Sequence, residues 1–117
     1  MEKPHKKLDV WKLSMDLVVE IYKLMRLLPP EEKYNLSSQI KRAVISIPAN
    51  LAEGAARNTK KEFANFLHIA QGSLSELDTH IEAAKLLGFL KNDDLKNADA
   101  LMTRIDKMLT GLIKRQK

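Results

Sequence analysis

The sequence predicts an all-α protein, folded as a left-handed, antiparallel, up-down four-helix bundle. Long segments repeat apolar residues at alternating intervals of three and four, as bundle helices do, and no segment shows a strand pattern. Short connections with proline, glycine or capping residues separate these segments. The 117 residues should therefore form a single domain, with helices at about 9–28, 36–57, 60–87 and 93–115.

The composition narrows the class of protein further. With 44% hydrophobic and 30% charged residues the chain should fold, and without cysteine it has neither disulfides nor thiolate chemistry. The N-terminus lacks the apolar core of a signal peptide, and no apolar run nears the ~18 residues that span a bilayer. We therefore expect a cytoplasmic protein with no membrane partner. The net charge of +5 favours polyanions without identifying one.

The first helix should end before Pro29 and Pro30, and it carries two apolar seams. The first seam, which suits the core, is Val10, Leu17, Ile21, Leu24 and Leu28. Together the seams cover roughly 200° of the helix circumference, which is more than the apolar stripe that packs against a single core. Something beyond the monomer should therefore cover the remaining apolar side chains. The second seam is therefore the candidate subunit interface: Trp11, Met15, Val18, Tyr22 and Met25.

The second helix should begin at a cap, Asn35 or Ser37, and its apolar phase continues through Pro48, which predicts a helix kinked at that proline. A polar stripe follows one flank of this helix. The favoured interpretation is a solvated face with an ion pair between Glu53 and Arg57, and the alternative is a polar seam at a subunit contact or in a nucleic-acid groove. The stripe consists of Gln39, Arg42, Ser46, Asn50, Glu53 and Arg57.

Capping signals define the last two helices. Thr59 and Glu62 have the spacing of a capping box, in which each side chain takes one free backbone donor, and Gly88 should close the third helix in a left-handed conformation. The fourth helix should be capped by Asn92 or Asp93. Its last turn carries cations that suit the helix dipole, namely Lys114, Arg115 and Lys117.

The sequence lacks the catalytic and metal-binding motifs of common enzyme classes. A di-iron bundle needs Glu-x-x-His pairs on its helices, and none of the four predicted helices carries one; Glu76 and His80 are four apart and should form a solvated pair. No phosphate loop or dinucleotide fingerprint occurs, and "QGSLSE" lacks the strand-turn-helix context of a nucleophilic serine. We therefore expect a non-enzyme that uses no metal, cofactor or small-molecule substrate.

The stretch "ARNTKKE" between the second and third helices could serve as a phosphate seat, because a helix start offers free backbone donors. A structural joint is the favoured interpretation, since the capping box fills part of that seat. The aromatic residues fall on apolar seams, so any nucleic-acid contact should run from lysine and arginine to phosphates. The main candidates are Lys41, Arg42, Arg57, Lys60 and Lys61, and further ones are Lys3, Lys6, Lys7, Lys114, Arg115 and Lys117.

Two stretches, "SQIKRAVISIPANLAEGAARN" and "FLHIAQGSLSELDT", carry a resemblance that extends over nearly the whole chain. The sequence resembles the bacterial four-helix bundle proteins encoded in intervening sequences of 23S ribosomal RNA genes. This resemblance implies an up-down bundle that assembles as a ring, commonly a homopentamer, similar in fold to the basic nucleic-acid-binding accessory protein of diversity-generating retroelements. It implies no established activity. It places "SIPANLAEG" in the family signature, where Asn50, Glu53 and Arg57 are expected to matter for packing or assembly.

Two hypotheses follow. The leading one is a non-enzymatic, oligomeric protein that associates with structured RNA or DNA through its basic residues. The alternative is a ring-shaped structural adaptor that presents a surface to a protein partner and has no role with nucleic acid. The two differ in one observable property, because only the first predicts salt-dependent affinity for RNA.

Overall fold

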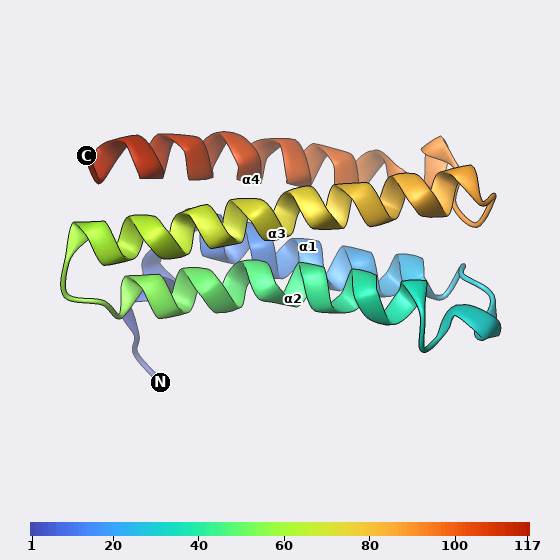
Figure 1. The fold of residues 1–117 in the computed structure, drawn as a ribbon, viewed down its shortest axis with the longest axis horizontal. Helices are drawn as coiled ribbons and strands as arrows, with labels where there is room; N and C mark the ends of the chain where they lie inside the picture. The colour runs from blue at the N-terminus through green and yellow to red at the C-terminus, as the bar shows by residue number, and fades with distance from the viewer.

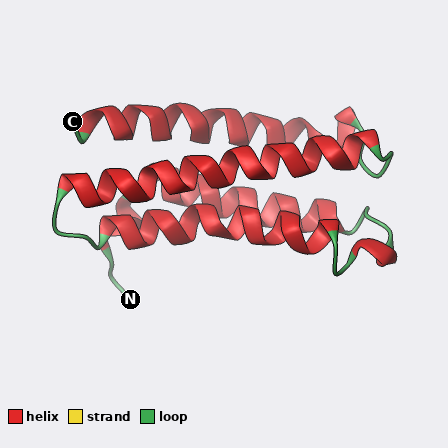
Figure 2. Cartoon of the chain, in the orientation of Figure 1, coloured by secondary structure: helices red, strands yellow, loops and turns green.

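Four long α-helices and no strand make up the protein in a computed structural model that describes residues 1–117, which confirms the predicted all-α class (Figure 2). The α-helices are α1 (Asp9–Met25), α2 (Leu36–Ala55), α3 (Lys60–Leu86) and α4 (Lys96–Arg115). Short 3₁₀ helices precede three of them: η1 (Pro4–Lys7), η2 (Pro30–Glu32) and η3 (Asn92–Leu95).

The helices lie side by side along the longest axis of a molecule that measures 44 × 25 × 19 Å (Figure 1). The α1–α2 and α3–α4 connections lie at one end, and the α2–α3 connection lies at the other end with both chain termini (Figure 1). Pro48 is buried inside α2, which is assigned as one helix from Leu36 to Ala55. The kink at Pro48 and the left-handed packing of the helices stay predictions.

One cluster of buried apolar side chains fills the space between the helices. The first seam of α1 lies in this core as predicted, with Leu17 and Ile21 fully buried. Burying a side chain of this size stabilises a protein by about 1.5–3 kcal/mol relative to exposure. The apolar seam of α3 is also buried, and it consists of Leu67, Ala70, Leu74, Leu77, Ile81 and Ala84. The core seam of α1 was therefore correctly predicted.

The most extensive contact between helices is that of α2 and α3, and small residues of α2 permit a close approach there. A Cβ added to Gly54 would lie only 2.7 Å from Phe66 Cβ and 2.9 Å from Phe63 Cδ1. The hydroxyls of Ser46 and Ser73 share a hydrogen bond of 2.8 Å across the same contact. The stretch "SIPANLAEG" thus supplies the small side chains that this helix pair requires.

The polar stripe of α2 is not the uniformly solvated face that was favoured from the sequence. Asn50 and Ser46 are half-buried at the α2–α3 contact, where Asn50 Nδ2 donates to the carbonyl oxygen of Ser46 at 2.8 Å and to its hydroxyl at 2.9 Å. Glu53 and Arg57 are exposed and form the predicted ion pair, with 3.1 Å between Nη2 and Oε2. The stripe therefore combines a half-buried hydrogen-bond network with a surface ion pair.

The ends of α3 follow the predicted capping chemistry with one difference. The backbone N–H of Glu62 donates to Thr59 Oγ1 at 3.1 Å, but the Glu62 carboxylate accepts from the Thr59 hydroxyl at 2.9 Å and not from its backbone amide. At the other end Gly88 has a φ of +83°, and the N–H of Phe89 donates to the carbonyl of Ala84 at 2.9 Å. This is the left-handed cap that glycine permits.

Helix boundaries differ from those predicted because tight turns replace α-helical ones. α1 stops at Met25, where the N–H of Leu27 donates to the residue three positions back at 2.9 Å. α2 receives no side-chain cap from Asn35; instead its first N–H donates to Glu32 Oε1 at 3.3 Å. α4 begins only at Lys96 because the 3₁₀ helix η3 occupies the predicted first turn.

Candidate functional site

The five main candidate cations fall into two separate groups. Lys41 and Arg42 lie on the first half of α2, whereas Arg57, Lys60 and Lys61 lie at the α2–α3 connection. At 1.5 Å per helical residue, the groups are about 20 Å apart along the α2 axis. The structure therefore does not bring all five predicted cations together.

Two of these cations are already engaged within the protein. The ammonium of Lys41 lies 5.0 Å from the centre of the Tyr22 ring. The guanidinium of Arg57 lies 4.9 Å from the centre of the Phe66 ring and also pairs with Glu53. Arg42, Lys60 and Lys61 are exposed and form no ion pair, so an incoming anion would meet these three cations unpaired, and two of the three lie at the α2–α3 connection.

A groove of about 330 Å³ lies beside this connection. Its walls come from Pro4 and Leu8 at the N-terminal segment, from Arg57 to Lys60, and from Gln116 near the C-terminus. Three segments that are far apart in the sequence therefore meet beside the first turn of α3. The groove adjoins the stretch for which a structural joint and a phosphate seat were both considered.

The candidate subunit interface is exposed along part of its length. Met15 and Tyr22 are 39% and 42% exposed, while Trp11 and Val18 are half-buried. Trp11 meets the His5 ring edge-on, with ring centres 5.0 Å apart, so the N-terminal segment shields one side of the indole.

Met25 was wrongly grouped with this interface. It is only 7% exposed and lies in the core of the monomer. The physical reason is helical geometry, because position 25 follows Ile21 by four residues and precedes Leu28 by three, and both of these residues are buried. Met25 therefore offers no appreciable surface to a second subunit.

The exposed apolar strip continues onto α2, which the sequence reasoning missed. The contact between Lys41 and Tyr22 shows that these helices adjoin there, and Ile45 follows Lys41 by one turn with 43% of its surface exposed. We call Met15, Val18, Tyr22 and Ile45 the α1–α2 surface. The sequence did carry a signal for this surface, because Ile45 is out of phase with the buried positions of α2.

The polar pair predicted on the third helix is present in the structure. Glu76 Oε2 and His80 Nε2 lie 3.3 Å apart on the surface of α3, as the predicted polar pair. No group of three or more His, Asp or Glu side chains is arranged to hold a metal ion. None of the helices combines the length and the apolar content that crossing a bilayer requires.

Known proteins resemble the chain over most of its length. The model of the family described as 23S rRNA-intervening sequence protein matches residues 6–111. A crystal structure of a protein with unknown function, from the S23 ribosomal protein family of Bacteroides thetaiotaomicron VPI-5482, superimposes with a TM-score of 0.81. The two chains are 28% identical, and the match covers 90% of this chain and 98% of the other. No curated protein matches the chain.

Proposed function

Because the chain belongs to the 23S rRNA-intervening sequence protein family, we propose that it is a non-enzymatic, oligomeric helical-bundle protein that binds nucleic acid through phosphate contacts. It would act in the cytoplasm, with structured RNA or DNA as its partner. The observation that supports this most is the pair of exposed, unpaired ammonium groups of Lys60 and Lys61 beside Arg57, on a chain of net charge +5. Such groups attract phosphates without reading bases.

Self-assembly is the second part of the proposal. The subunit is an up-down, antiparallel, left-handed bundle, bent at Pro48, and the ring is a homopentamer joined through the α1–α2 surface. The exposed fractions of Met15, Tyr22 and Ile45 support this, because large apolar side chains are favourably removed from water at a subunit contact. A closed ring requires each subunit to present two different patches to its neighbours, one on each side.

The test is fluorescence anisotropy of a labelled ribosomal RNA fragment, with a DNA duplex for comparison, titrated with the protein at several salt concentrations. The proposal predicts binding that weakens as salt rises, because the protein displaces counterions from the phosphates. A variant with Lys41, Arg42, Arg57, Lys60 and Lys61 changed to Gln should lose this binding and stay assembled. Absence of RNA binding by the unmodified protein at low salt would refute the nucleic-acid role.

A structural adaptor for a protein partner is the second candidate function. It is favoured by exposed apolar side chains at the end opposite the chain termini, where Leu86 and Leu87 are 87% and 62% exposed and Tyr34 is 84% exposed. Exposed apolar side chains of this size are frequent at protein contacts. This candidate predicts no salt-dependent affinity for RNA, so the same titration distinguishes the two functions.

A further inference from the structure

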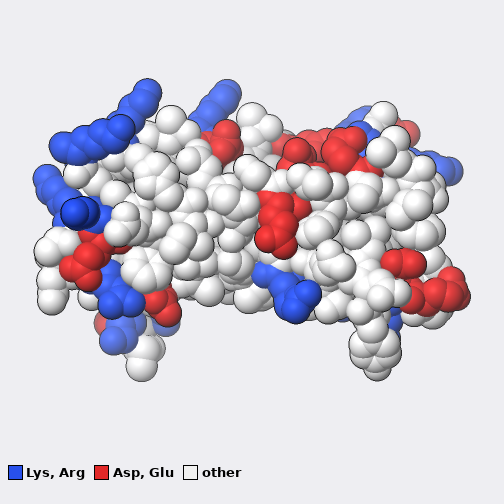
Figure 3. Space-filling model, in the orientation of Figure 1, with Lys and Arg blue, Asp and Glu red and all other residues white.

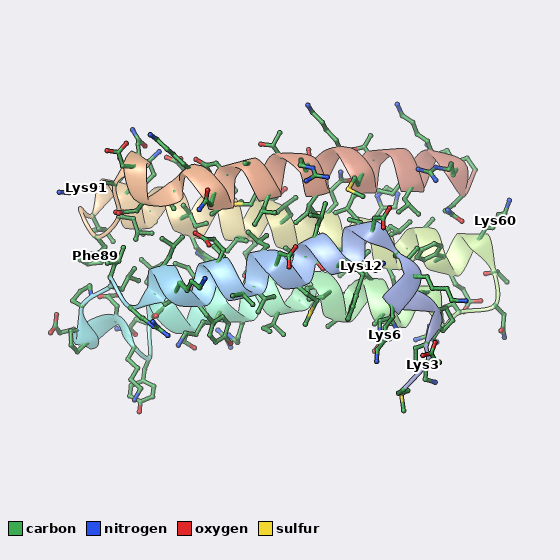
Figure 4. All side chains as sticks on the ribbon, turned by 180° about the vertical axis from the view of Figure 1, so that it is seen from behind. Lys3, Lys6, Lys12, Lys60, Phe89 and Lys91 are labelled. Carbon is green, nitrogen blue, oxygen red and sulfur yellow. The ribbon has the colours of Figure 1, made fainter.

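Lysine and arginine side chains from three distant parts of the chain meet at one end of the bundle. In Figure 4, Lys3, Lys6 and Lys60 lie at the end with the chain termini, while Lys91 and Phe89 lie at the opposite end. On the face drawn in Figure 3, the blue side chains are most numerous at the end with the chain termini. We call this group the basic end: Lys3, Lys6, Lys7, Arg57, Lys60, Lys61, Lys114, Arg115 and Lys117.

The nine cations of the basic end outnumber the side-chain carboxylates there, which are Glu2, Asp9, Glu53 and Glu62. Glu53 forms its ion pair with Arg57, Glu62 accepts from the Thr59 hydroxyl, and no other residue of the basic end forms an ion pair. At the opposite end the charges of both signs are interspersed, and Lys96 pairs with Asp93 at 3.6 Å. The excess positive charge of the protein is therefore concentrated where the termini meet the α2–α3 connection.

Resting on the proposed function, we propose that nucleic-acid phosphates bind across the basic end and not along the side of α2 that carries Lys41 and Arg42. The bundle is at most 25 Å wide across its long axis, a width that faces about seven successive phosphates of one strand at 3.4 Å per phosphate. Exposed charges act together within a Debye length of about 8 Å at physiological salt. Lys60 and Gln116 line the same groove, so the lysines around the α2–α3 connection and the C-terminus face one incoming polyanion together.

The kind of surface favours nucleic acid over a lipid membrane. Membrane-surface sites combine basic residues with apolar side chains that enter the lipid. Of the large apolar side chains that are at least half exposed, Met1 lies near the basic end. Val19 and Ile69 lie within α1 and α3, and the others lie at the opposite end: Leu27, Tyr34, Leu86 and Leu87. The phenylalanine rings near the basic end, Phe63 and Phe66, are only partly exposed, and Arg57 lies over Phe66, so contacts to phosphates should dominate and binding should show little sequence preference.

Two variants that remove the same number of charges test this proposal. The first changes Lys60, Lys61, Lys114 and Arg115 to Gln at the basic end. The second, a control of equal net charge, changes cations remote from the basic end: Lys33, Lys41, Arg42 and Lys91 to Gln. Circular dichroism and light scattering first establish that both variants keep their helices and their mass. Anisotropy with a labelled 23S rRNA fragment then gives the salt dependence of the affinity.

The basic-end variant should lower the slope of log affinity against log salt by about 3, since each lost phosphate contact removes ~0.7–0.9. Its affinity at low salt should fall by more than about tenfold, whereas the control should change the slope by less than about 1. If both variants lose affinity for RNA equally, or if the basic-end variant loses none, phosphates do not bind mainly across the basic end. RNA binding by the unmodified protein would still stand in that case. Failure of the unmodified protein to bind RNA would instead refute the proposed function. Tighter, basic-end-dependent binding to phosphatidylserine vesicles than to RNA would also overturn the assignment.

Discussion

Replacing Gly54 with alanine tests whether the close contact between α2 and α3 is what the small residues of α2 provide. The added Cβ would lie 2.7 Å from Phe66 Cβ and 2.9 Å from Phe63 Cδ1, whereas non-bonded carbons prefer about 3.5–4.0 Å. The Phe66 Cβ is fixed to the α3 backbone and cannot rotate away. The two helices would therefore have to separate by about 1 Å at this point.

The expected free-energy change combines two opposing effects. Forcing an extra carbon into a packed contact costs about 1–3 kcal/mol. Alanine recovers up to about 1 kcal/mol because it favours the helical conformation more than glycine does. We therefore expect Gly54→Ala to destabilise the fold by about 1–2 kcal/mol, which lowers the Tm by about 4–8 °C in a domain of this size.

Thermal unfolding followed by circular dichroism measures this change, at one fixed protein concentration because assembly makes the Tm concentration-dependent. Gly72→Ala is the matched control. Gly72 lies inside α3, is exposed, and a Cβ added there meets nothing within 4 Å, so alanine should stabilise the protein by about 0.5–1 kcal/mol. If both variants raise the Tm equally, the close contact does not limit the packing and the reasoning is wrong.

Three further predictions follow from local geometry and exposure. Thr59→Ala should cost about 1 kcal/mol in a urea titration because α3 loses its cap, and Thr59→Ser should restore most of it. Gly88→Ala should cost about 1–2 kcal/mol in the same titration, because its φ of +83° strains any residue with a Cβ; an unchanged midpoint would show that the turn rearranges. Met15→Asp combined with Tyr22→Asp should give the 13.3 kDa monomer in light scattering with helical content unchanged, whereas Ile69→Asp, on the exposed face of α3, should keep the assembled mass. Retention of the assembled mass by the double variant would remove the α1–α2 surface from the proposal.

The features that were predicted correctly depend on local sequence. Apolar periodicity located the four helices, and the chemistry of Thr59 and Gly88 located both ends of α3. The misplaced boundaries have local causes of a different kind. The 3₁₀ turns around Leu27 and in η3 use the same residue types as α-helical turns, so spacing alone does not separate them.

Features that depend on how helices meet could not be predicted from periodicity. Met25 fits both seams of α1 by spacing, and only the folded bundle shows that it belongs to the core. Ile45 is out of phase with the buried positions of α2. It can be assigned to the α1–α2 surface only once the contact between Lys41 and Tyr22 shows that the two helices adjoin there. Asn50 was assigned to a wet face because its burial depends on how closely α3 approaches.

The grouping of the lysines and arginines also could not be predicted from the sequence. The sequence named every lysine and arginine of the basic end, but it grouped Lys41 and Arg42 with Arg57, Lys60 and Lys61. Separating these two groups requires the length of α2 and the position of the chain termini, which only the folded bundle supplies. Residue type therefore identified the candidate phosphate contacts, and the fold showed which of these cations lie at the same end of the bundle.

The most direct test of the central claim is the mass of the protein in solution, measured by light scattering with and without a 23S rRNA fragment at low and at high salt. We expect a mass several times 13.3 kDa for the protein alone, and a further increase with RNA that disappears at high salt. A 13.3 kDa monomer whose mass does not change with RNA at low salt would contradict both the assembly and the nucleic-acid role.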